Sequence, residues 1–122
     1  MVGRPLLNDA REKWEYKEHT RVKHQILDKY LHAWISILGG THNQINIFDC
    51  FAGRGKYEDG SYGSPIIILR QLAEIRKNRN IPKRAMCVFI ENNRNNFENM
   101  KIVIEKEIVC LLYTSDAADE LD

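Results

Sequence analysis

The stretch NIFDCFAGRGKYEDGSYGSP, from Asn46 to Pro65, decides the fold, because three kinds of local structure follow one another in it. The segment from Ile45 to Phe48, apolar except for Asn46, is short and rich in β-branched residues, which favours a strand buried on both faces. Small residues and glycines come directly after Asp49 and indicate a turn. Ser64 is a suitable helix cap, and Pro65 suits the first helical position, where its missing N–H costs nothing. The stretch therefore predicts a strand, a turn and a helix in succession.

Apolar residues at helical spacing precede this stretch. A first helix is expected from Thr20, its N-cap, to Leu38, and the Gly39-Gly40 pair is expected to stop it. The residues expected on its buried face recur at steps of three and four: Val22, Ile26, Leu27, Tyr30, Leu31, Trp34, Ile35 and Leu38.

A second strand and a third helix follow the stretch. The helix that begins at Ser64 is expected to fade in the basic segment 76–80, and Ala85 to Ile90 predicts a second buried strand. The apolar spacing from Phe97 to Ile108 predicts the third helix. The order is thus helix, strand, helix, strand, helix, which predicts a parallel, right-handed α/β unit. Ligands of such folds bind at the carboxyl ends of the strands, where Asp49 and Glu91 stand.

Composition sets limits on function. The chain has 122 residues, of which 43% are hydrophobic and 29% charged, and it predicts a single small domain. No apolar run approaches the roughly 20 residues that span a bilayer, and Met1 to Leu7 lacks a signal-peptide core, so we expect a cytoplasmic protein without a membrane partner. The three cysteines lack metal-type spacing, so no metal site is expected. Cys50 and Cys87 are interpreted as small buried side chains.

The last residues suggest a non-native origin. The segment CLLYTSDAADE, from Cys110 to Glu120, resembles the translation of a widely used sequencing adapter over eleven residues. We therefore expect residues 1–19 to be a lead-in, residues 20–109 to be the N-terminal portion of a truncated domain, and residues 110–122 to be an artefact. Residues 1–109 carry 18 basic and 13 acidic side chains, a net charge of +5, which is compatible with a nucleic-acid partner. Because two strands cannot bury both faces of a sheet, apolar surface is expected to be exposed around Ile66 to Leu72.

The glycine turn can be compared with known phosphate-binding loops. A P-loop ending at Gly55-Lys56 would place Cys50 at its first glycine and Tyr57 at its hydroxyl position, so it does not fit. A dinucleotide fingerprint would need a third glycine where Glu58 stands. The pattern that fits is Asp-x-Phe-Ala-Gly-x-Gly, in residues 49–55.

This pattern resembles the first motif of class I methyltransferases that use S-adenosylmethionine, and in particular the FAGxG form of DNA methyltransferases. The resemblance implies a Rossmann-like, class I methyltransferase-type sheet. It also implies that Asp49 meets the ammonium group of the cofactor, that Glu91 binds the ribose hydroxyls and that Asn92 touches the adenine edge. The cofactor-binding residues implied in this way are Asp49, Phe51, Ala52, Gly53, Gly55, Glu91 and Asn92. Taken singly, Asp49 can also be read as a capping or turn acid, and Glu91 as a solvated residue at a strand end.

A closer resemblance covers roughly Trp14 to Asn93. The segments HTRVKHQILDKYLHAWISIL, FDCFAGRGKYEDGSYGSP and CVFIENN are similar in order and spacing to the three-Cys-motif partner family, TcmP. This family resembles methyltransferases, and its genes lie beside that of a three-cysteine, radical-SAM-like protein. The resemblance implies a methyltransferase-like protein with nucleic acid as a candidate substrate, or a non-catalytic, cofactor- or nucleotide-binding partner subunit. Its catalytic residues would lie beyond Val109.

The segment from Lys56 to Gly63 separates the glycine turn from the next helix. It has two interpretations of equal weight: a lid or substrate-facing loop, with Arg54 and Lys56 meeting an anionic substrate, and a plain surface hairpin. The polar residues His19, Lys23 and His24 on the leading helix have two interpretations: they reach the site, or, as we expect for each, they form a solvated face beside the packed stripe.

The origin of the tail is tested by reading the source locus through codon 109 with a different library chemistry. We expect the reading frame to continue past Val109 into further strands. If CLLYTSDAADELD and a stop codon return unchanged, the tail is native, and a non-catalytic binding role becomes the better interpretation.

Overall fold

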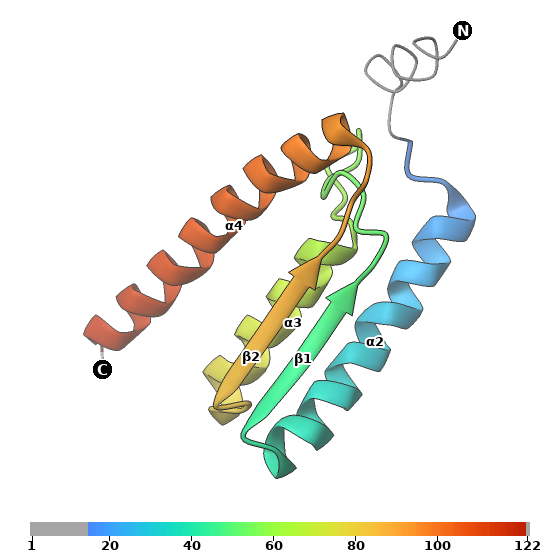
Figure 1. Ribbon diagram of the computed structural model, residues 1–122. Helices are drawn as coiled ribbons and strands as arrows, with labels where there is room; N and C mark the ends of the chain where they lie inside the picture. The colour runs from blue at the N-terminus through green and yellow to red at the C-terminus, as the bar shows by residue number, and fades with distance from the viewer. Residues whose placement is uncertain (1–14, 122) are drawn as a thin grey trace, which may run out of the picture.

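The computed structural model describes residues 15–121, and the side chains of residues 15–111. Within these residues the elements follow the expected order of helix, strand, helix, strand, helix (Figure 1). They are α2 (Glu18–Thr41), β1 (Gln44–Asp49), α3 (Ser64–Arg79), β2 (Arg84–Phe89) and α4 (Arg94–Leu121). The described chain is therefore a mixed α/β structure with a two-stranded parallel sheet. Of the expected lead-in, residues 1–19, residues 1–14 lie outside the described residues, and Glu18 and His19 already belong to α2.

The two strands pair in parallel along their whole length, from Gln44 opposite Arg84 to Asp49 opposite Phe89. The pairing continues past the strand ends. The N–H of Ile90 donates to the carbonyl of Asp49 at 2.8 Å, and the N–H of Ala52 donates to the carbonyl of Ile90 at 3.0 Å. The strand ends and the start of the glycine turn are consequently held side by side.

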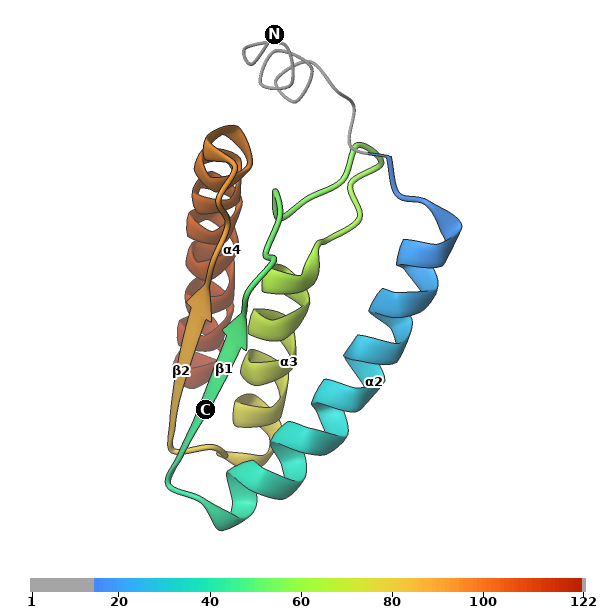
Figure 2. The same ribbon diagram turned by 45° about the vertical axis from the view of Figure 1, so that its right-hand side comes forward.

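The core lies between one face of the sheet and the helices α2 and α3. In both views α3 runs along the strands, with α2 on the side of β1 and α4 on the side of β2 (Figures 1 and 2). The buried residues of the core cluster are Leu31, Ile35, Ile45, Ile47, Ile68, Leu72 and Ile75. Branched aliphatic side chains from α2, β1 and α3 therefore fill this layer, and Ala85, Cys87 and Phe89 of β2 are partly buried against it.

The opposite face of the sheet remains open among the described residues, so the expectation of strands buried on both faces is wrong for this chain. Along β1 only Ile45 and Ile47 are buried, while Phe48 is 59% exposed. Met86 of β2 is 44% exposed. In the folded chain α3 turns Ile66, Ile68 and Leu72 into the core. The expected exposure of the segment from Ile66 to Leu72 in an aggregating or partly molten chain stays a prediction.

Helix α2 departs from the prediction at both ends. It begins at Glu18 rather than after a Thr20 cap, and it continues through Gly39 and Gly40 to Thr41. Its buried residues are Leu31, Ile35 and Gly39, which follow one another at steps of four. Val22, Ile26 and Tyr30, which were expected on the buried face, are 44%, 64% and 62% exposed.

Gly39 continues the helix because it allows a close approach to the next connection. A Cβ on Gly39 would lie 3.2 Å from the nitrogen of Pro82, tighter than an ordinary contact. A Cβ on Gly40 would lie 3.7 Å from the Cδ1 of Ile81, at ordinary van der Waals distance. The glycine pair that predicted a helix stop therefore serves helix packing.

Helix α3 begins at Ser64 as expected, but Ser64 does not cap it. The N-cap is Gly63, which has no side-chain cap, and Pro65 lies in the first turn. The hydroxyl of Ser64 is directed instead to the carboxylate of Asp49. The helix ends at Arg79, and Asn80 follows in the left-handed conformation with a φ of 57°, which confirms that it ends in the basic segment.

Helix α4 begins at Arg94 and runs through the expected junction between Val109 and Cys110 to Leu121. A helical backbone does not test the expected origin of residues 110–122, because Leu, Ala and Glu are good helix formers in any setting. No helix of the described residues is long and apolar enough to cross a membrane.

The glycine pair of α2 gives a matched test of packing. Gly39→Val is expected to lower the free energy of unfolding by about 1–3 kcal/mol, because the side chain overpacks against Pro82. Gly40→Ala is expected to raise it by about 0.5–1 kcal/mol, because alanine lowers the entropic cost of the helix without a clash. Urea unfolding followed by circular dichroism measures both, and equal effects of the two variants would contradict the close approach at Gly39.

Candidate functional site

The carboxyl ends of β1 and β2 bring together the glycine turn and two acids. Asp49 is the last residue of β1 and is partly buried. Its Oδ2 accepts a hydrogen bond from the Ser64 hydroxyl at 2.5 Å, and its Oδ1 accepts a longer one from the N–H of Phe51 at 3.4 Å. Asp49 therefore joins the end of the strand to the start of α3 and to the first residues of the turn.

Both glycines of the turn have a left-handed backbone, and one of them, Gly55, is in addition closely packed. Gly53 and Gly55 have φ angles of 75° and 90°, which residues with a Cβ adopt only with strain. Gly55 is also buried, and a Cβ there would lie 3.3 Å from the Cβ of Val103 in α4. In addition, the side chain of Asn99 donates to the carbonyl of Arg54 at 2.9 Å. The turn thus packs against the beginning of α4.

Glu91 connects the turn to the end of β2. One oxygen of its carboxylate accepts the N–H of Gly53 at 2.8 Å, and the other accepts the N–H of Asn93 at 3.0 Å. Hydrogen bonds from N–H groups to an ionised carboxylate are among the stronger ones in proteins. The solvated alternative for Glu91 is therefore wrong, because the side chain is partly buried and bonded to two segments of backbone.

The other sequence-predicted site residues differ in exposure. Ala52 is buried, with 2% of its surface exposed, and supports the turn from below. Phe51 is 92% exposed, and Asn92 is exposed beside Glu91. The expectation that Cys50 is a buried side chain is wrong, because Cys50 is exposed, whereas Cys87 is partly buried and burial raises the pKa of its thiol.

The segment after the turn is a closed hairpin-like loop. Lys56 and Tyr62 form an antiparallel bridge, and the N–H of Tyr57 donates to the carbonyl of Ser61 at 2.8 Å. The N–H of Gly63 donates to the carbonyl of Gly55 at 2.8 Å, so the two ends of the loop meet. These bonds fit the hairpin interpretation, while contact with an anionic substrate stays a prediction.

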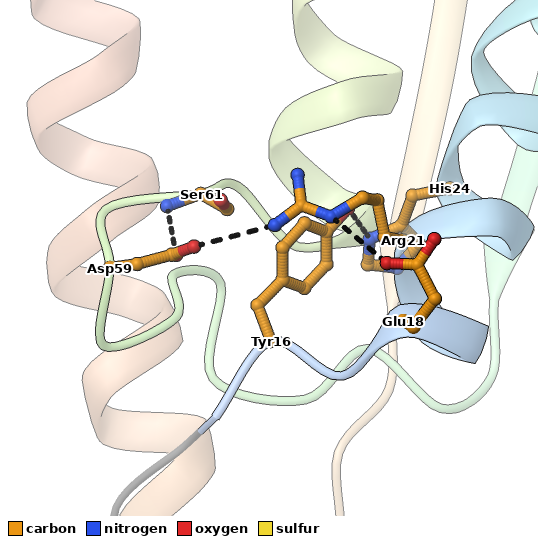
Figure 3. A network of polar contacts seen from close by, with 6 residues as sticks. All are labelled: Tyr16, Glu18, Arg21, His24, Asp59 and Ser61. Carbon is orange, nitrogen blue, oxygen red and sulfur yellow. Dashed lines mark hydrogen bonds and ion pairs between the residues drawn. The ribbon is translucent and has the colours of Figure 1, made fainter.

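An aromatic cluster holds this loop against the beginning of α2, and Figure 3 shows two of its members, Tyr16 and His24. The rings of Tyr16 and Tyr57 have centroids 4.6 Å apart, and the ring of His24 lies 5.9 Å from that of Tyr57. The Tyr16 hydroxyl and the Nδ1 of His24 form a hydrogen bond of 3.0 Å. We call Tyr16, His24 and Tyr57 the aromatic cluster. The loop is thereby fastened to Tyr16 and His24, both of which come before β1 in the sequence.

Charged residues add a second connection to the same place. The guanidinium of Arg21 lies 4.7 Å from the centroid of the Tyr16 ring and 3.8 Å from Asp59 in the loop. The N–H of Ser61 donates to Asp59 at 2.9 Å and holds the pKa of that carboxyl below its usual range (Figure 3). Arg21 also lies 3.8 Å from Glu18. Exposed pairs of this kind contribute little individually, so the aromatic contacts are the main fastening.

The far side of the loop is held by Tyr62. The cations of Lys56 and Arg70 lie 5.5 Å and 5.2 Å from the centroid of its ring. The neighbouring carboxylate of Glu107 in α4, together with burial, raises the pKa of the Tyr62 hydroxyl. The loop is therefore held at Tyr57 against the beginning of α2 and at Tyr62 beside Arg70 of α3.

Sequence reasoning missed the aromatic cluster. His24 was expected on a solvated face, but it is partly buried, and burial lowers its pKa. His19 and Lys23 are exposed, as expected. The position of Tyr57 in a glycine-rich loop was the available signal, yet nothing in a linear pattern indicates which helix such a ring packs against.

No protein-family model, no curated protein and no solved structure matches this chain. Among residues 15–111, whose side chains the structure describes, there is no group of three or more His, Cys, Asp or Glu that could hold a metal ion.

The two glycines with left-handed backbone give a matched test of the turn. Gly60 has a φ of 91° and open space around it, so Gly60→Ala is expected to cost about 1–2 kcal/mol of stability for the backbone alone. Gly55→Ala is expected to cost about 1–3 kcal/mol more, because its methyl group meets Val103. Denaturant unfolding of both variants measures the difference, and equal losses would show that α4 does not pack closely on the turn.

Proposed function

We propose that this chain is part of a Rossmann-like, class I methyltransferase-type protein of the three-Cys-motif partner family, and that the carboxyl ends of β1 and β2 bind S-adenosylmethionine. One observation carries the proposal. The glycine turn, Asp49 and Glu91 meet at the carboxyl ends of two adjacent parallel strands, which is where α/β sheets bind their ligands.

The contacts of the two acids leave room for a ligand. An ionised carboxylate has about four acceptor sites, and the bonds described above use two on Asp49 and two on Glu91. In the proposed complex Asp49 accepts from the ammonium group of the cofactor and Glu91 from the ribose hydroxyls. Asn92, exposed next to Glu91, is assigned to the adenine edge.

The turn supports the same assignment through its backbone. Gly53 and Gly55 have no Cβ, which lets a ligand approach the main chain closely. The ring of Phe51 is 92% exposed next to the turn and is available to pack against an apolar part of the cofactor. Ala52, in the same turn, is buried, so this part of the turn faces the protein interior.

The chemistry that we propose is methyl transfer from the sulfonium centre of the cofactor. Such a reaction needs chiefly a nucleophile held in line with the methyl carbon and shielded from water. The described residues would bind and orient the cofactor, and no catalytic residue is assigned. Nucleic acid is the proposed acceptor class, supported by the net charge of +5 on residues 1–109.

A second candidate is a partner subunit that binds the cofactor or a nucleotide without turnover, beside a three-cysteine, radical-SAM-like protein. The bonds of Asp49 and Glu91 to the protein itself hold the turn in place without any ligand, which suits this candidate and the methyltransferase equally. The two candidates share the binding site and differ in whether methyl transfer follows.

Calorimetric titration of the 122-residue chain with S-adenosylmethionine tests the binding site. Asp49→Asn is expected to weaken binding roughly tenfold or more, because the ammonium group loses its charged partner. Ser64→Ala is the matched control. It removes the hydroxyl that donates to Asp49 but keeps the carboxylate and its charge, so binding should weaken by no more than about twofold, the effect of a less well oriented carboxylate.

Two results would contradict this proposal. A folded chain that binds no S-adenosylmethionine would remove the cofactor assignment, and equal affinities of Asp49→Asn and the unchanged chain would remove the role of Asp49. If binding is found, transfer of a labelled methyl group to RNA or DNA supports the methyltransferase. Binding without transfer supports the partner subunit.

A further inference from the structure

Helix α2 carries an apolar row that is not part of the core. Its members are exposed and follow one another at steps of four, four, three and four residues: Val22, Ile26, Tyr30, Ala33 and Ile37. Residues at these steps lie on one face of a helix. The opposite face of the same helix carries Leu31 and Ile35, which are buried in the core. We call the five exposed residues the α2 stripe.

The α2 stripe faces away from the rest of the described structure. In both views α2 is the outermost element on the side of β1 (Figures 1 and 2). Ile26 and Ile37 are 64% and 66% exposed. A single exposed isoleucine is ordinary on a protein surface, whereas a continuous apolar row marks a surface that packs against a partner. The stripe is about 22 Å long, which corresponds to about four turns of helix.

Positive charge borders the α2 stripe on both sides. A rotation of about 100° per residue places Lys23 on one side of the stripe and Lys29 on the other, and both are exposed. The two acids of α2 are engaged elsewhere. Asp28 accepts a hydrogen bond of 2.8 Å from the side chain of Gln71, and Glu18 lies 3.8 Å from Arg21. The surface is therefore complementary to an apolar row with acidic borders.

We propose that the α2 stripe is the docking surface for an amphipathic helix of another protein, whose apolar residues pack on the stripe and whose bordering residues are acidic. Helices commonly bind in this way, through anchor residues at steps of three and four. The inference goes beyond the proposed ligand site at the strand ends. It does not depend on that site, because none of the five residues belongs to it.

The charges favour such a partner over a second copy of this chain. A second α2 would bring two more lysines to the borders, and both of its acids are already engaged. Like charges along the borders of two paired helices oppose their association. Self-association through the stripe would therefore gain the apolar contact without any complementary charge.

The large apolar residues of α2 favour a helix over a lipid surface. Helices that lie in a membrane interface bury a wide apolar face that carries residues such as Trp, Phe and Leu. In α2 the residues of this kind, Leu27, Leu31 and Trp34, pack in or against the core. The stripe that remains is narrow and suits the ridge of one helix.

The test uses two synthetic peptides of about 18 residues, long enough for a helix that covers the stripe. Both carry leucines at helical spacing on one face, and the bordering residues are glutamate in the first and lysine in the second. Binding to the 122-residue chain is measured by fluorescence anisotropy. The glutamate peptide should bind with a dissociation constant of roughly 1–100 μM, and the lysine peptide should bind at least about fivefold more weakly.

Two variants separate the apolar contact from the charge. Ile26→Gln should weaken binding of the glutamate peptide roughly tenfold, because it removes an apolar anchor without adding charge. Ile102→Gln, at an isoleucine of α4 that is 52% exposed, is the matched control and should leave binding unchanged. The double variant Lys23→Glu/Lys29→Glu should reverse the preference, so that the lysine peptide binds more tightly.

Other occupants of the stripe give different results, and each would overturn the proposal. A dimer of the unchanged chain in sedimentation that Ile26→Gln abolishes would assign the stripe to a second copy. Binding to phosphatidylserine vesicles that Ile26→Gln abolishes would assign it to a lipid surface. A clear fall in the midpoint of urea unfolding in Ile26→Gln would mean that another segment of this chain covers the stripe, since an exposed side chain contributes little to stability.

The peptides themselves can also contradict the inference. If neither peptide binds, or if both bind equally well, the stripe is not a docking surface for an acidic helix. Equal effects of Ile26→Gln and Ile102→Gln would lead to the same conclusion. None of these results bears on the binding of S-adenosylmethionine, so the proposed function and this inference fail separately.

Discussion

The carboxylate of Glu91 is the contact on which the geometry of the candidate site depends. It accepts the N–H of Gly53 with one oxygen and the N–H of Asn93 with the other, so it holds the glycine turn and the end of β2 together. The position of the turn determines where the loop begins. The two ends of the loop are joined by the hydrogen bond from the N–H of Gly63 to the carbonyl of Gly55. Loss of this carboxylate would leave two partly buried N–H groups without a charged acceptor, which is costly in a low-dielectric setting.

The acids at the strand ends form hydrogen bonds within the protein and are also the residues proposed to bind the ligand. Asp49 accepts from Ser64 and from Phe51, as a turn acid does, yet it keeps acceptor capacity for a ligand. The same holds for Glu91. A structural role is therefore no argument against a binding role here, since the internal bonds orient each carboxylate and reduce the entropy that is lost when a ligand binds.

The loop and the sheet differ in how completely they are packed. Ring contacts fasten the loop to the beginning of α2 through Tyr57, which lies against Tyr16 and His24, and Arg70 of α3 lies over the ring of Tyr62. The sheet, in contrast, is covered on one face, and Phe48 and Met86 are exposed on the other. An apolar sheet face normally packs against another layer. The described residues form only two layers, the sheet and the helices on one of its faces.

The sequence by itself determined the elements, their order and the residues at the strand ends, because hydrophobic period, glycines and proline act over a few neighbouring residues. The helix ends were predicted less well, since Gly39 and Ser64 are used for contacts with Pro82 and Asp49 that no local pattern encodes. Only the tertiary structure decided which face of each element is buried and that His24 meets Tyr16 and Tyr57. The physical reason is that these contacts join segments far apart in the chain, so they depend on how the helices pack on the sheet.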